Sequence, residues 1–457
     1  MTNLNIEEIL KTRTFSGIST DTRTIKEGEL FIALRGENFD GHDFVEKAAT
    51  KKAAGAIIDS KIQGLKGLKS KKFILIQAKD TLSAFGDIAH FYRMRFKIPL
   101  IGITGSSGKT TAKEMIYEVL SSKFKVLKNK GTENNSIGLS HTLLRLHPGH
   151  SIGVMELGTN HFGEIRRLSQ VLKPTVGIIT NIGPAHLEFL KSEAGVLKEK
   201  MELLKSLDKD GLAIINADDA LLKDIKGLKC KIVKFGMDKN CDFKVTKIFQ
   251  EKEAIWFTVN GNHDFKIRLL GKQNVYNALI AITVGFLHGV DFNSIHNALS
   301  EFKPLNGRLC LRSLGPIKVI DDTYNSNPQS VKAALAVLAS YKSAGRKILI
   351  CADMLELGSL ADKFHAETGR AISKANPDYL ISVGNFSKTI NEAAIFGGMN
   401  KDAVISCKDN LDVLKTLKAI VSEGDVLLLK GSRRMKLNEV ADALSSSIST
   451  QGDMVRV

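Results

Sequence analysis

One short segment of the sequence combines the residue types that phosphate chemistry needs. It runs from Thr104 to Thr111 and reads TGSSGKTT. Its glycines let backbone N–H groups approach phosphate oxygens, Lys109 can neutralise phosphate charge, and Thr110 can offer its hydroxyl to Mg²⁺. The strict phosphate-loop pattern has glycine where this chain has Ile103, which argues against a standard GTPase loop but not against nucleotide binding. The predicted nucleotide contacts are Gly105, Ser106, Ser107, Gly108, Lys109, Thr110 and Thr111.

Two further polar residues follow short apolar runs that have the composition of buried strands. Glu156 ends the run Ile152–Met155, and His186 follows the run Val176–Thr180. The carboxyl ends of parallel strands form the ligand-binding edge of a sheet, so both side chains are candidates for one site. Taken alone, His186 also fits a loop or N-cap residue.

The segments around these residues alternate between apolar runs and helical patterns. The run Ile98–Ile103 precedes the glycine-rich loop, and apolar residues from Ala112 to Leu120 follow it at helical spacing. Later runs, separated by stretches long enough for crossovers, predict a parallel sheet covered by helices. Past Arg308, further runs of this kind predict a second doubly wound unit.

We therefore predict an α/β fold with three domains, because 457 residues exceed one typical domain. Residues 1–97 are expected to form a small α/β domain and residues 98–308 a central phosphate-loop domain with a parallel sheet. Residues 309–457 are expected to form a Rossmann-like domain. The second boundary is placed near Pro304–Arg308, where Pro and Gly interrupt helix and strand patterns.

The composition limits the classes of function. Lysine and arginine exceed the acidic residues by 16, which suits nucleic acid, an anionic membrane or phosphate-bearing substrates alike. The lysines are dispersed without interleaved aromatics, so we expect no nucleic-acid partner. Five scattered cysteines without CxxC spacing argue against disulfides or zinc. No run is long enough to span a bilayer and the first residues lack a signal-peptide pattern, so a cytoplasmic protein without stable membrane insertion is expected.

In combination, these features resemble the Mur ligase family, which also includes folylpolyglutamate synthase, over essentially the whole chain. The glycine-rich loop, Glu156, the histidine of TNIGPAH and the segment Lys198–Leu203 occur in the family's order. The resemblance implies an ATP- and Mg²⁺-dependent ligase that joins a carboxylate to an amine through an acyl phosphate. In that family a lysine at the position of Lys200 is carbamylated and helps to hold a second Mg²⁺. Without the resemblance, Lys200 would be interpreted as a solvated helix lysine.

The resemblance also assigns roles to residues across the chain. The implied catalytic residues are Lys109, Glu156, His186 and Lys200, and the implied metal ligands are Thr110, Glu156, His186 and Lys200. Gly271–Ala278 resembles the adenine-contacting helix start, where Asn277 and then Asn274 are the candidates, with an N-capping role as the alternative. Arg308 matches an arginine that reaches ATP, and Asp322 would accept a hydrogen bond from a ribose hydroxyl.

Within the family, the strongest resemblance is to enzymes that use UDP-N-acetylmuramoyl-tripeptide and D-alanyl-D-alanine. It rests on the segments DDTYNSNPQS, ADMLELG, MELGTNHFGEI and GTENNSIGL, and the Asp-Asn-Pro-Arg motif of the enzyme that adds the third residue is absent from the sequence. Two N-terminal segments resemble those that dock the uridine diphosphate, although STDTR also fits a plain polar turn. The predicted substrate contacts are Thr22, Arg35, Gly36, Asn134 and Asn135.

Three other interpretations stay open. Another amide ligase of the same family would share the loop and the strand-end residues. A nucleic-acid-stimulated ATPase would account for the positive charge, but it leaves Glu156, His186 and Lys200 unexplained. A non-catalytic nucleotide-binding scaffold would be free to lose Lys109 or Glu156, and both are present. For the ligase we expect a monomer whose C-terminal domain closes over the central one near Asn306–Arg308.

Overall fold

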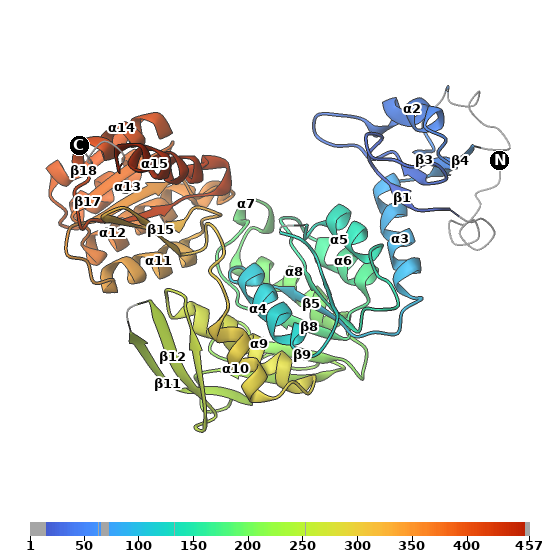
Figure 1. Cartoon of the computed structure of the whole chain (residues 1–457), viewed down its shortest axis with the longest axis horizontal. Helices are drawn as coiled ribbons and strands as arrows, with labels where there is room; N and C mark the ends of the chain where they lie inside the picture. The colour runs from blue at the N-terminus through green and yellow to red at the C-terminus, as the bar shows by residue number, and fades with distance from the viewer. Residues whose placement is uncertain (1–14, 63, 65–72, 132, 252, 453–457) are drawn as a thin grey trace.

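The computed structural model describes residues 15–62, 64, 73–131, 133–251 and 253–452. The expectation that no signal peptide is present depends mainly on residues 1–14, which lie outside this part. Within the described part, no helix has the length and apolar character needed to cross a membrane. Three α/β units follow one another along a crescent, with the N-terminal and C-terminal units at its two tips and the central unit between them (Figure 1).

The N-terminal unit is a parallel sheet with the strand order β1-β2-β3-β4. Alternate residues of β2 face opposite sides, so that Leu30 and Ile32 belong to a core with α3 and Phe31 to a core with α2. Helix α3 also packs against α5 and α6 of the central unit and so joins the two. The elements are β1 (Ile18–Ser19), β2 (Leu30–Ile32), α2 (Val45–Thr50), β3 (Gly55–Asp59), β4 (Ile74–Ala78) and α3 (Thr81–Arg93).

The central unit is a mostly parallel sheet with the order β13-β12-β11-β10-β9-β8-β5-β7-β6. Ile214 lies on the face covered by α4 and α9, whereas its neighbour Ile215 lies on the face covered by α6 and α8. Its strands are β5 (Leu100–Thr104), β6 (Val126–Lys128), β7 (Ile152–Glu156), β8 (Val176–Ile179), β9 (Leu212–Asn216), β10 (Lys231–Gly236), β11 (Phe243–Glu251), β12 (Ala254–Val259) and β13 (His263–Ile267). Its helices are α4 (Lys109–Ser121), α5 (Ser136–Leu143), α6 (Glu164–Leu172), α7 (Leu187–Leu190), α8 (Glu193–Lys205), α9 (Gln273–Leu287) and α10 (Phe292–Ser300).

The antiparallel ribbon β11–β13 at one edge of this sheet was not predicted from the sequence. These strands are exposed on one face, as at Phe249 and Trp256, and they carry charged residues between their apolar ones. A half-exposed strand lacks the continuous apolar run that marks a buried parallel strand, so the pattern was missed.

The C-terminal unit is a sheet with the order β14-β15-β19-β16-β17-β18, in which β14 is antiparallel to β15 and the other pairs are parallel. Because β19 lies between β15 and β16, the chain crosses over as in a doubly wound fold. The elements are β14 (Cys310–Leu314), β15 (Ile317–Asp322), α11 (Pro328–Ser340), β16 (Lys347–Ala352), α12 (Ala361–Ala375), β17 (Tyr379–Val383), α13 (Ser387–Phe396), β18 (Val404–Cys407), α14 (Asn410–Ile420), β19 (Val426–Lys430) and α15 (Leu437–Gly452).

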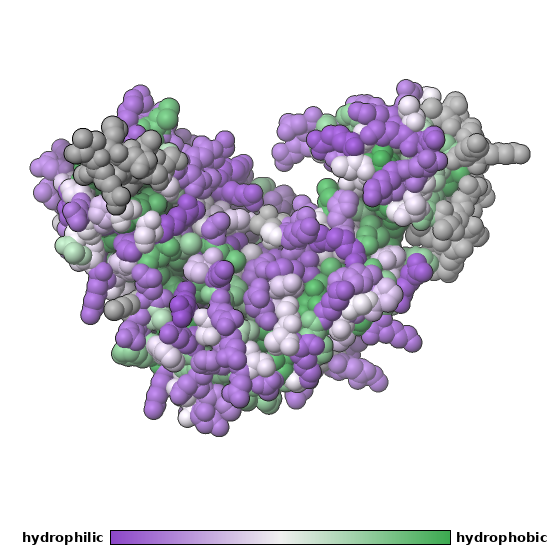
Figure 2. Space-filling model, viewed as in Figure 1, coloured by the Kyte–Doolittle hydropathy of each residue, from purple (hydrophilic) through white to green (hydrophobic). Residues whose placement is uncertain are grey.

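The α/β fold class predicted from the sequence is confirmed. The three sheets lie within residues 18–78, 100–267 and 310–430, so the predicted boundaries after residues 97 and 308 fall between them. The boundaries themselves stay a prediction, because sheets alone do not define where a domain ends. The space-filling view shows the molecule hollowed along one edge, between the N-terminal and C-terminal units (Figure 2).

Candidate active site

The glycine-rich loop lies at the carboxyl end of β5 and is fastened to the segment that follows β8. Gly108 caps α4 with a φ of +81°, a conformation that glycine adopts readily. The Ser106 hydroxyl donates to the Gly183 carbonyl at 3.0 Å, and the Ser107 N–H donates to Asn181 Oδ1 at 3.0 Å. These bonds fix the loop at the start of α4, where helix N–H groups favour an anion.

Lys109 folds back over this loop. Its ammonium donates to the Gly105 carbonyl at 2.8 Å. Burial lowers the pKa of Lys109, with the nearby Arg308 acting in the same direction and the Glu156 carboxylate opposing both. From this position the side chain can rotate so that its ammonium contacts a phosphate oxygen, with no change in the backbone.

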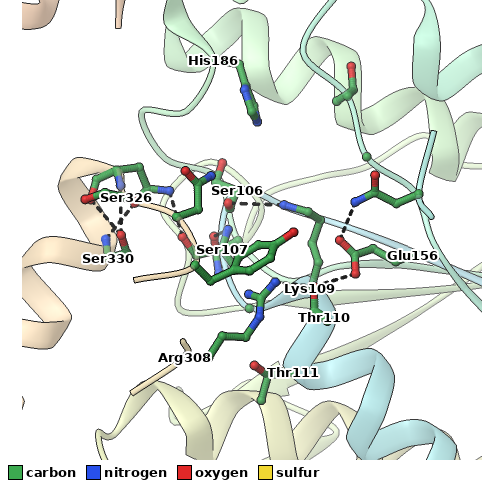
Figure 3. A pocket seen from close by; sticks show the side chains of 18 of the residues that line it. Ser106, Ser107, Lys109, Thr110, Thr111, Glu156, His186, Arg308, Ser326 and Ser330 are labelled. Carbon is green, nitrogen blue, oxygen red and sulfur yellow. Dashed lines mark hydrogen bonds between the residues drawn. The ribbon is translucent and has the colours of Figure 1, made fainter. Parts of the chain in front are cut away.

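Glu156, at the end of β7, is tied to the loop and to the junction with the C-terminal unit. The Thr110 hydroxyl donates to Glu156 Oε2 at 2.7 Å, and Arg308 Nη2 donates to the Thr110 oxygen at 2.7 Å. Asn134 Nδ2 donates to the other Glu156 oxygen at 2.8 Å. Figure 3 shows Lys109, Thr110, Glu156 and Arg308 together at one end of the cavity.

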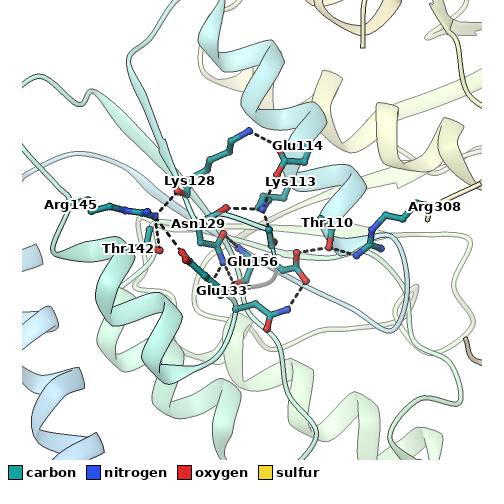
Figure 4. Close-up of polar contacts among 12 residues, drawn as sticks. Thr110, Lys113, Glu114, Lys128, Asn129, Glu133, Thr142, Arg145, Glu156 and Arg308 are labelled. Carbon is teal, nitrogen blue, oxygen red and sulfur yellow. Dashed lines mark hydrogen bonds and ion pairs between the residues drawn. The ribbon is translucent and has the colours of Figure 1, made fainter. Parts of the chain in front are cut away.

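A buried network behind Glu156 fixes its backbone (Figure 4). The Asn129 side chain accepts from the Glu156 N–H at 3.0 Å and donates to the Glu156 carbonyl at 3.1 Å. The Lys113 ammonium, fully buried on α4, donates to the Asn129 carbonyl at 2.8 Å and pairs with Glu114 at 2.9 Å. Helix α4 thus contacts Glu156 directly through Thr110 and indirectly through Lys113. We call Thr110, Lys113, Asn129 and Glu156 the α4 ring.

His186 caps α7 on the far side of the cavity and contacts the C-terminal unit. Its Nδ1 lies 2.5 Å from Glu356 Oε2. Hydrogen bonding to His186 lowers the pKa of Glu356. In Figure 3 the imidazole points from α7 toward the phosphate loop. The prediction that His186 belongs to the same site as Glu156 agrees with this position, because both line one cavity.

Lys200 is one of the largest fully buried side chains, with 1% of its surface exposed. Burial and the neighbouring Lys109 charge lower the pKa of Lys200 well below its ordinary value. The interpretation as a solvated surface lysine is therefore wrong, since almost none of the side chain is exposed to solvent.

The nucleotide-binding residues expected near adenine and ribose also line the cavity. Asn274 Nδ2 donates to the Leu270 carbonyl at 2.8 Å, and Asn277 Nδ2 donates to Asn274 Oδ1 at 2.9 Å. Neither asparagine is the N-cap of α9, which is Lys272. Asp322, at the end of β15, pairs with the buried Lys430 ammonium at 3.0 Å.

The cavity encloses about 630 Å³ between the central and C-terminal units. It is lined by the phosphate loop and by Glu156, His186, Arg308 and Asp322, together with the predicted substrate residues Asn134 and Asn135. This volume suits a nucleotide-sized ligand. Asn135 is the N-cap of α5 and accepts from the Gly138 N–H, so its side-chain oxygen is already engaged.

The three predicted N-terminal contacts, Thr22, Arg35 and Gly36, are not among the described residues that line this cavity. Thr22 is buried, and Arg35 pairs with Asp40 at 2.9 Å and Asp59 at 3.2 Å. These acids raise the pKa of Arg35. The structure thus places these residues in a separate unit on the other side of the hollow seen in Figure 2.

Several cavity residues were not predicted as functional. The Tyr324 ring lies under the Arg308 guanidinium, 3.9 Å from its centre, and Asn327 Nδ2 donates to the Ser107 hydroxyl at 3.1 Å. Lys430 donates to the Asn325 carbonyl at 2.5 Å. Tyr324 and Asn327 belong to the segment DDTYNSNPQS and Lys430 ends β19, but only the fold brings them together against the phosphate loop.

Comparison with known proteins assigns this arrangement to a family. Family models match residues 14–93 as "Mur ligase family, catalytic domain", residues 103–285 as "Mur ligase middle domain" and residues 307–433 as "Mur ligase, glutamate ligase domain". The UDP-N-acetylmuramoyl-tripeptide–D-alanyl-D-alanine ligase of Bacillus subtilis is 36% identical over 95% of this chain and 94% of its own. The chain belongs to the Mur ligase family. The ligase of the same name from Escherichia coli is 35% identical over 95% of this chain and 94% of its own.

Solved structures of Mur ligases have the same architecture. A crystal structure of MurF from Acinetobacter baumannii superposes with a TM-score of 0.85 at 28% identity, covering 94% of each chain. MurF ligase from Thermotoga maritima, solved in complex with ADP, superposes with a TM-score of 0.83 at 25% identity, covering 95% of this chain and 98% of its own. The three-unit fold described above is thus the Mur ligase fold.

Proposed function

We propose that this Mur ligase uses ATP to join UDP-N-acetylmuramoyl-tripeptide to D-alanyl-D-alanine, with release of ADP and phosphate. The observation that carries the proposal is the similarity over nearly the whole chain to ligases of that name. The reaction belongs to peptidoglycan precursor synthesis and takes place in the cytoplasm. A nucleic-acid-stimulated ATPase has no comparable support, and the phosphate loop next to Glu156 and Arg308 suits transfer to a bound carboxylate.

The reaction needs no protein nucleophile. The terminal carboxylate of the tripeptide attacks the γ-phosphorus of ATP in line, which forms an acyl phosphate and releases ADP. Lys109 and Arg308 stabilise the charge that develops on the transferring group. The amine of D-alanyl-D-alanine then attacks the acyl carbon, loses a proton and expels phosphate. Closure of the C-terminal unit over the central one would keep water from the acyl phosphate.

The donor set at the loop fits Mg²⁺. Thr110 and Glu156 supply hard oxygens 2.7 Å apart beside the phosphate loop. Mg²⁺ usually keeps waters and binds through one or two carboxylates and substrate phosphates, so a closed protein cage is not needed. Among the described residues, no group of three His, Cys, Asp or Glu side chains forms such a cage. Bound Mg²⁺ would neutralise charge on the phosphoryl oxygens.

His186 and a carbamylated Lys200 are proposed to hold a second Mg²⁺. Carbamylation needs a neutral amine, whose nitrogen bonds to the carbon of CO₂ and releases a proton. The burial of the Lys200 side chain, which is 1% exposed, supports this assignment, because burial lowers the pKa of Lys200 and so favours the neutral amine. A carbamate on Lys200 would supply two hard oxygens, and Glu156 and Lys109 lie close enough to influence the charge of Lys200.

We assign adenine to Asn277 and Asn274, and ribose to Asp322. The Asp322 carboxylate already pairs with Lys430 and accepts from the Leu309 N–H at 3.2 Å. A carboxylate has about four acceptor positions, so a ribose hydroxyl can still be accommodated. Thr22, Arg35 and Gly36 are proposed to bind the uridine diphosphate at the N-terminal unit, away from the phosphate loop.

Replacing Gly108 with alanine tests how closely the loop and Asn277 fit together. A Cβ at Gly108 would lie 2.5 Å from Asn277 Oδ1, and its φ of +81° disfavours any other residue. We expect ADP to bind about tenfold more weakly, a cost of about 1.4 kcal/mol measured by calorimetry.

The matched control is Gly163→Ala. Gly163 also caps a helix, with a φ of +91°, but a Cβ there meets nothing within 4 Å. Both variants should lose about 1–2 kcal/mol of stability through backbone strain. Only Gly108→Ala should weaken ADP binding, and equal ADP affinities in the two variants would contradict the placement of Asn277 against the nucleotide.

A panel of amines tests the proposed reaction directly. With ATP and UDP-N-acetylmuramoyl-tripeptide, we expect D-alanyl-D-alanine to give a kcat/KM about 10²-fold or more above those of diaminopimelate or glutamate. The measurements are phosphate release and the mass of the product, with RNA and DNA as further additions. Efficient use of a single amino acid would move the chain to a sibling ligase, and stimulation by nucleic acid alone would favour the ATPase.

A further inference from the structure

The contact between His186 and Glu356 joins the two units that enclose the cavity. His186 belongs to the central unit, at the start of α7, whereas Glu356 follows β16 of the C-terminal unit. Their side chains are 23% and 28% exposed, and the separation of Nδ1 and Oε2 is 2.5 Å. The contact is therefore a close, partly buried hydrogen bond across the cavity wall.

The hydrogen bond determines which ring nitrogen carries the proton. An ionised carboxylate only accepts hydrogen bonds, so Nδ1 of His186 must be the donor to Glu356. In the neutral ring this leaves Nε2 with its lone pair available. The ring points into the cavity toward the phosphate loop (Figure 3), so the free nitrogen is presented on that side.

The backbone has an unusual conformation at both residues of the contact. His186 has a φ of 55° and Glu356 a φ of 63°, left-handed conformations that side-chain-bearing residues seldom adopt. The Glu188 N–H donates to the Glu356 carbonyl at 3.0 Å. A Cβ at Gly358 would lie 3.0 Å from the Glu188 Cα, so the two segments touch closely there.

From this geometry we infer that Glu356 is a positioning residue for the ligase reaction. It fixes the tautomer and plane of the His186 ring so that Nε2 keeps its lone pair free on the side of the phosphate loop, and it does so only while the C-terminal unit lies against the central one. The inference rests on the proposed function, in which His186 helps to hold the second Mg²⁺. It makes closure of the two units a condition for a correctly oriented histidine. Partners of this kind commonly orient a metal-binding imidazole.

Attachment of the two units does not depend on Glu356. Leu187 and Leu190 of α7 belong to the same buried apolar cluster as Met354 and Leu357. The other partner of Glu356, Arg434, lies 3.8 Å away and is 74% exposed, so it contributes little. Removing the Glu356 carboxylate should therefore change the tautomer and orientation of the His186 ring, while the apolar contact keeps the two segments together.

The test compares Glu356→Ala and Glu356→Gln with Glu188→Gln, which removes a nearby exposed carboxylate that does not touch His186. We expect kcat to fall about 10- to 100-fold in Glu356→Ala and less in Glu356→Gln, whose amide oxygen can still accept from Nδ1. The KM values for ATP and D-alanyl-D-alanine and the Tm should change little. Glu188→Gln should behave as the wild type.

A spectroscopic readout separates this role from a purely structural one. In protein with ¹⁵N-labelled histidine rings, we expect His186, identified by its loss in His186→Gln, to show the Nδ1–H tautomer in the wild type and to lose it in Glu356→Ala. An unchanged ring signal, or a defect confined to KM or Tm, would overturn the inference. A wild-type chain that ligates no amine would refute the proposed function, while the ring signals would still report on Glu356.

Discussion

Replacing Lys109 with alanine is expected to reduce kcat/KM by about 10³-fold, because the ammonium is placed to stabilise charge that develops on the transferring phosphoryl group. Its only hydrogen bonds in the described structure are to carbonyls of the loop itself, Gly105 at 2.8 Å and Ser106 at 3.5 Å. Its loss should therefore leave the core intact. The measurements are steady-state kinetics and thermal unfolding.

Lys125→Ala is the control for this variant, since Lys125 is exposed just beyond α4. It should retain full activity. Lys109→Arg keeps the charge but replaces a point charge with a planar fork, so we expect only partial activity. Wild-type turnover in Lys109→Ala would refute the assignment of the loop as the phosphate site.

Replacing Lys200 with alanine is expected to lower kcat by at least about 10²-fold, because the second Mg²⁺ would lose the oxygen ligands of the carbamate. A carbamate supplies two hard oxygens, whereas a neutral or cationic amine supplies none suited to Mg²⁺. Acetate or formate can enter the vacated space as a substitute carboxylate. We therefore expect these acids to restore part of the rate in Lys200→Ala, measured as phosphate release against acid concentration.

Two variants make this result specific. Lys200→Glu places a carboxylate on a shorter side chain, which should stop short of the site and restore less activity than the added acids. Lys198→Ala removes an exposed lysine from the same helix and should be unaffected by either acid. Near-normal activity of Lys200→Ala would reject the carbamate and leave Glu156 and His186 as the proposed side-chain ligands beyond the phosphate loop.

The sequence predicted those parts of the site whose residues lie close together along the chain. The phosphate loop is one such segment, since a buried strand, a glycine-rich turn and an amphipathic helix follow one another directly. Glu156 could be placed because it ends an apolar run, and the edge of a parallel sheet is where such residues meet. The Mur ligase resemblance added Lys200, whose burial the local pattern did not suggest.

The contacts that the sequence did not reveal join residues far apart in the chain. His186 and Glu356 are 170 positions apart, and Arg308 and Thr110 are 198 apart. Lys113 was unremarkable as one lysine among many, because only the fold shows that the chain buries it completely. No local periodicity encodes such pairs, since each depends on how whole sheets are placed against each other.

The α4 ring has a consequence for the order of events during catalysis. Thr110, Lys113, Asn129 and Glu156 all belong to the central unit, so they keep their arrangement whether or not the C-terminal unit is present. The C-terminal unit contacts this site through the side chains of Asn327 and Glu356, which bond to Ser107 and His186. Arg308, at the junction of the two units, bonds to Thr110. The phosphates of ATP can therefore bind to the central unit first, and the chemical step requires the C-terminal unit to take its place against it.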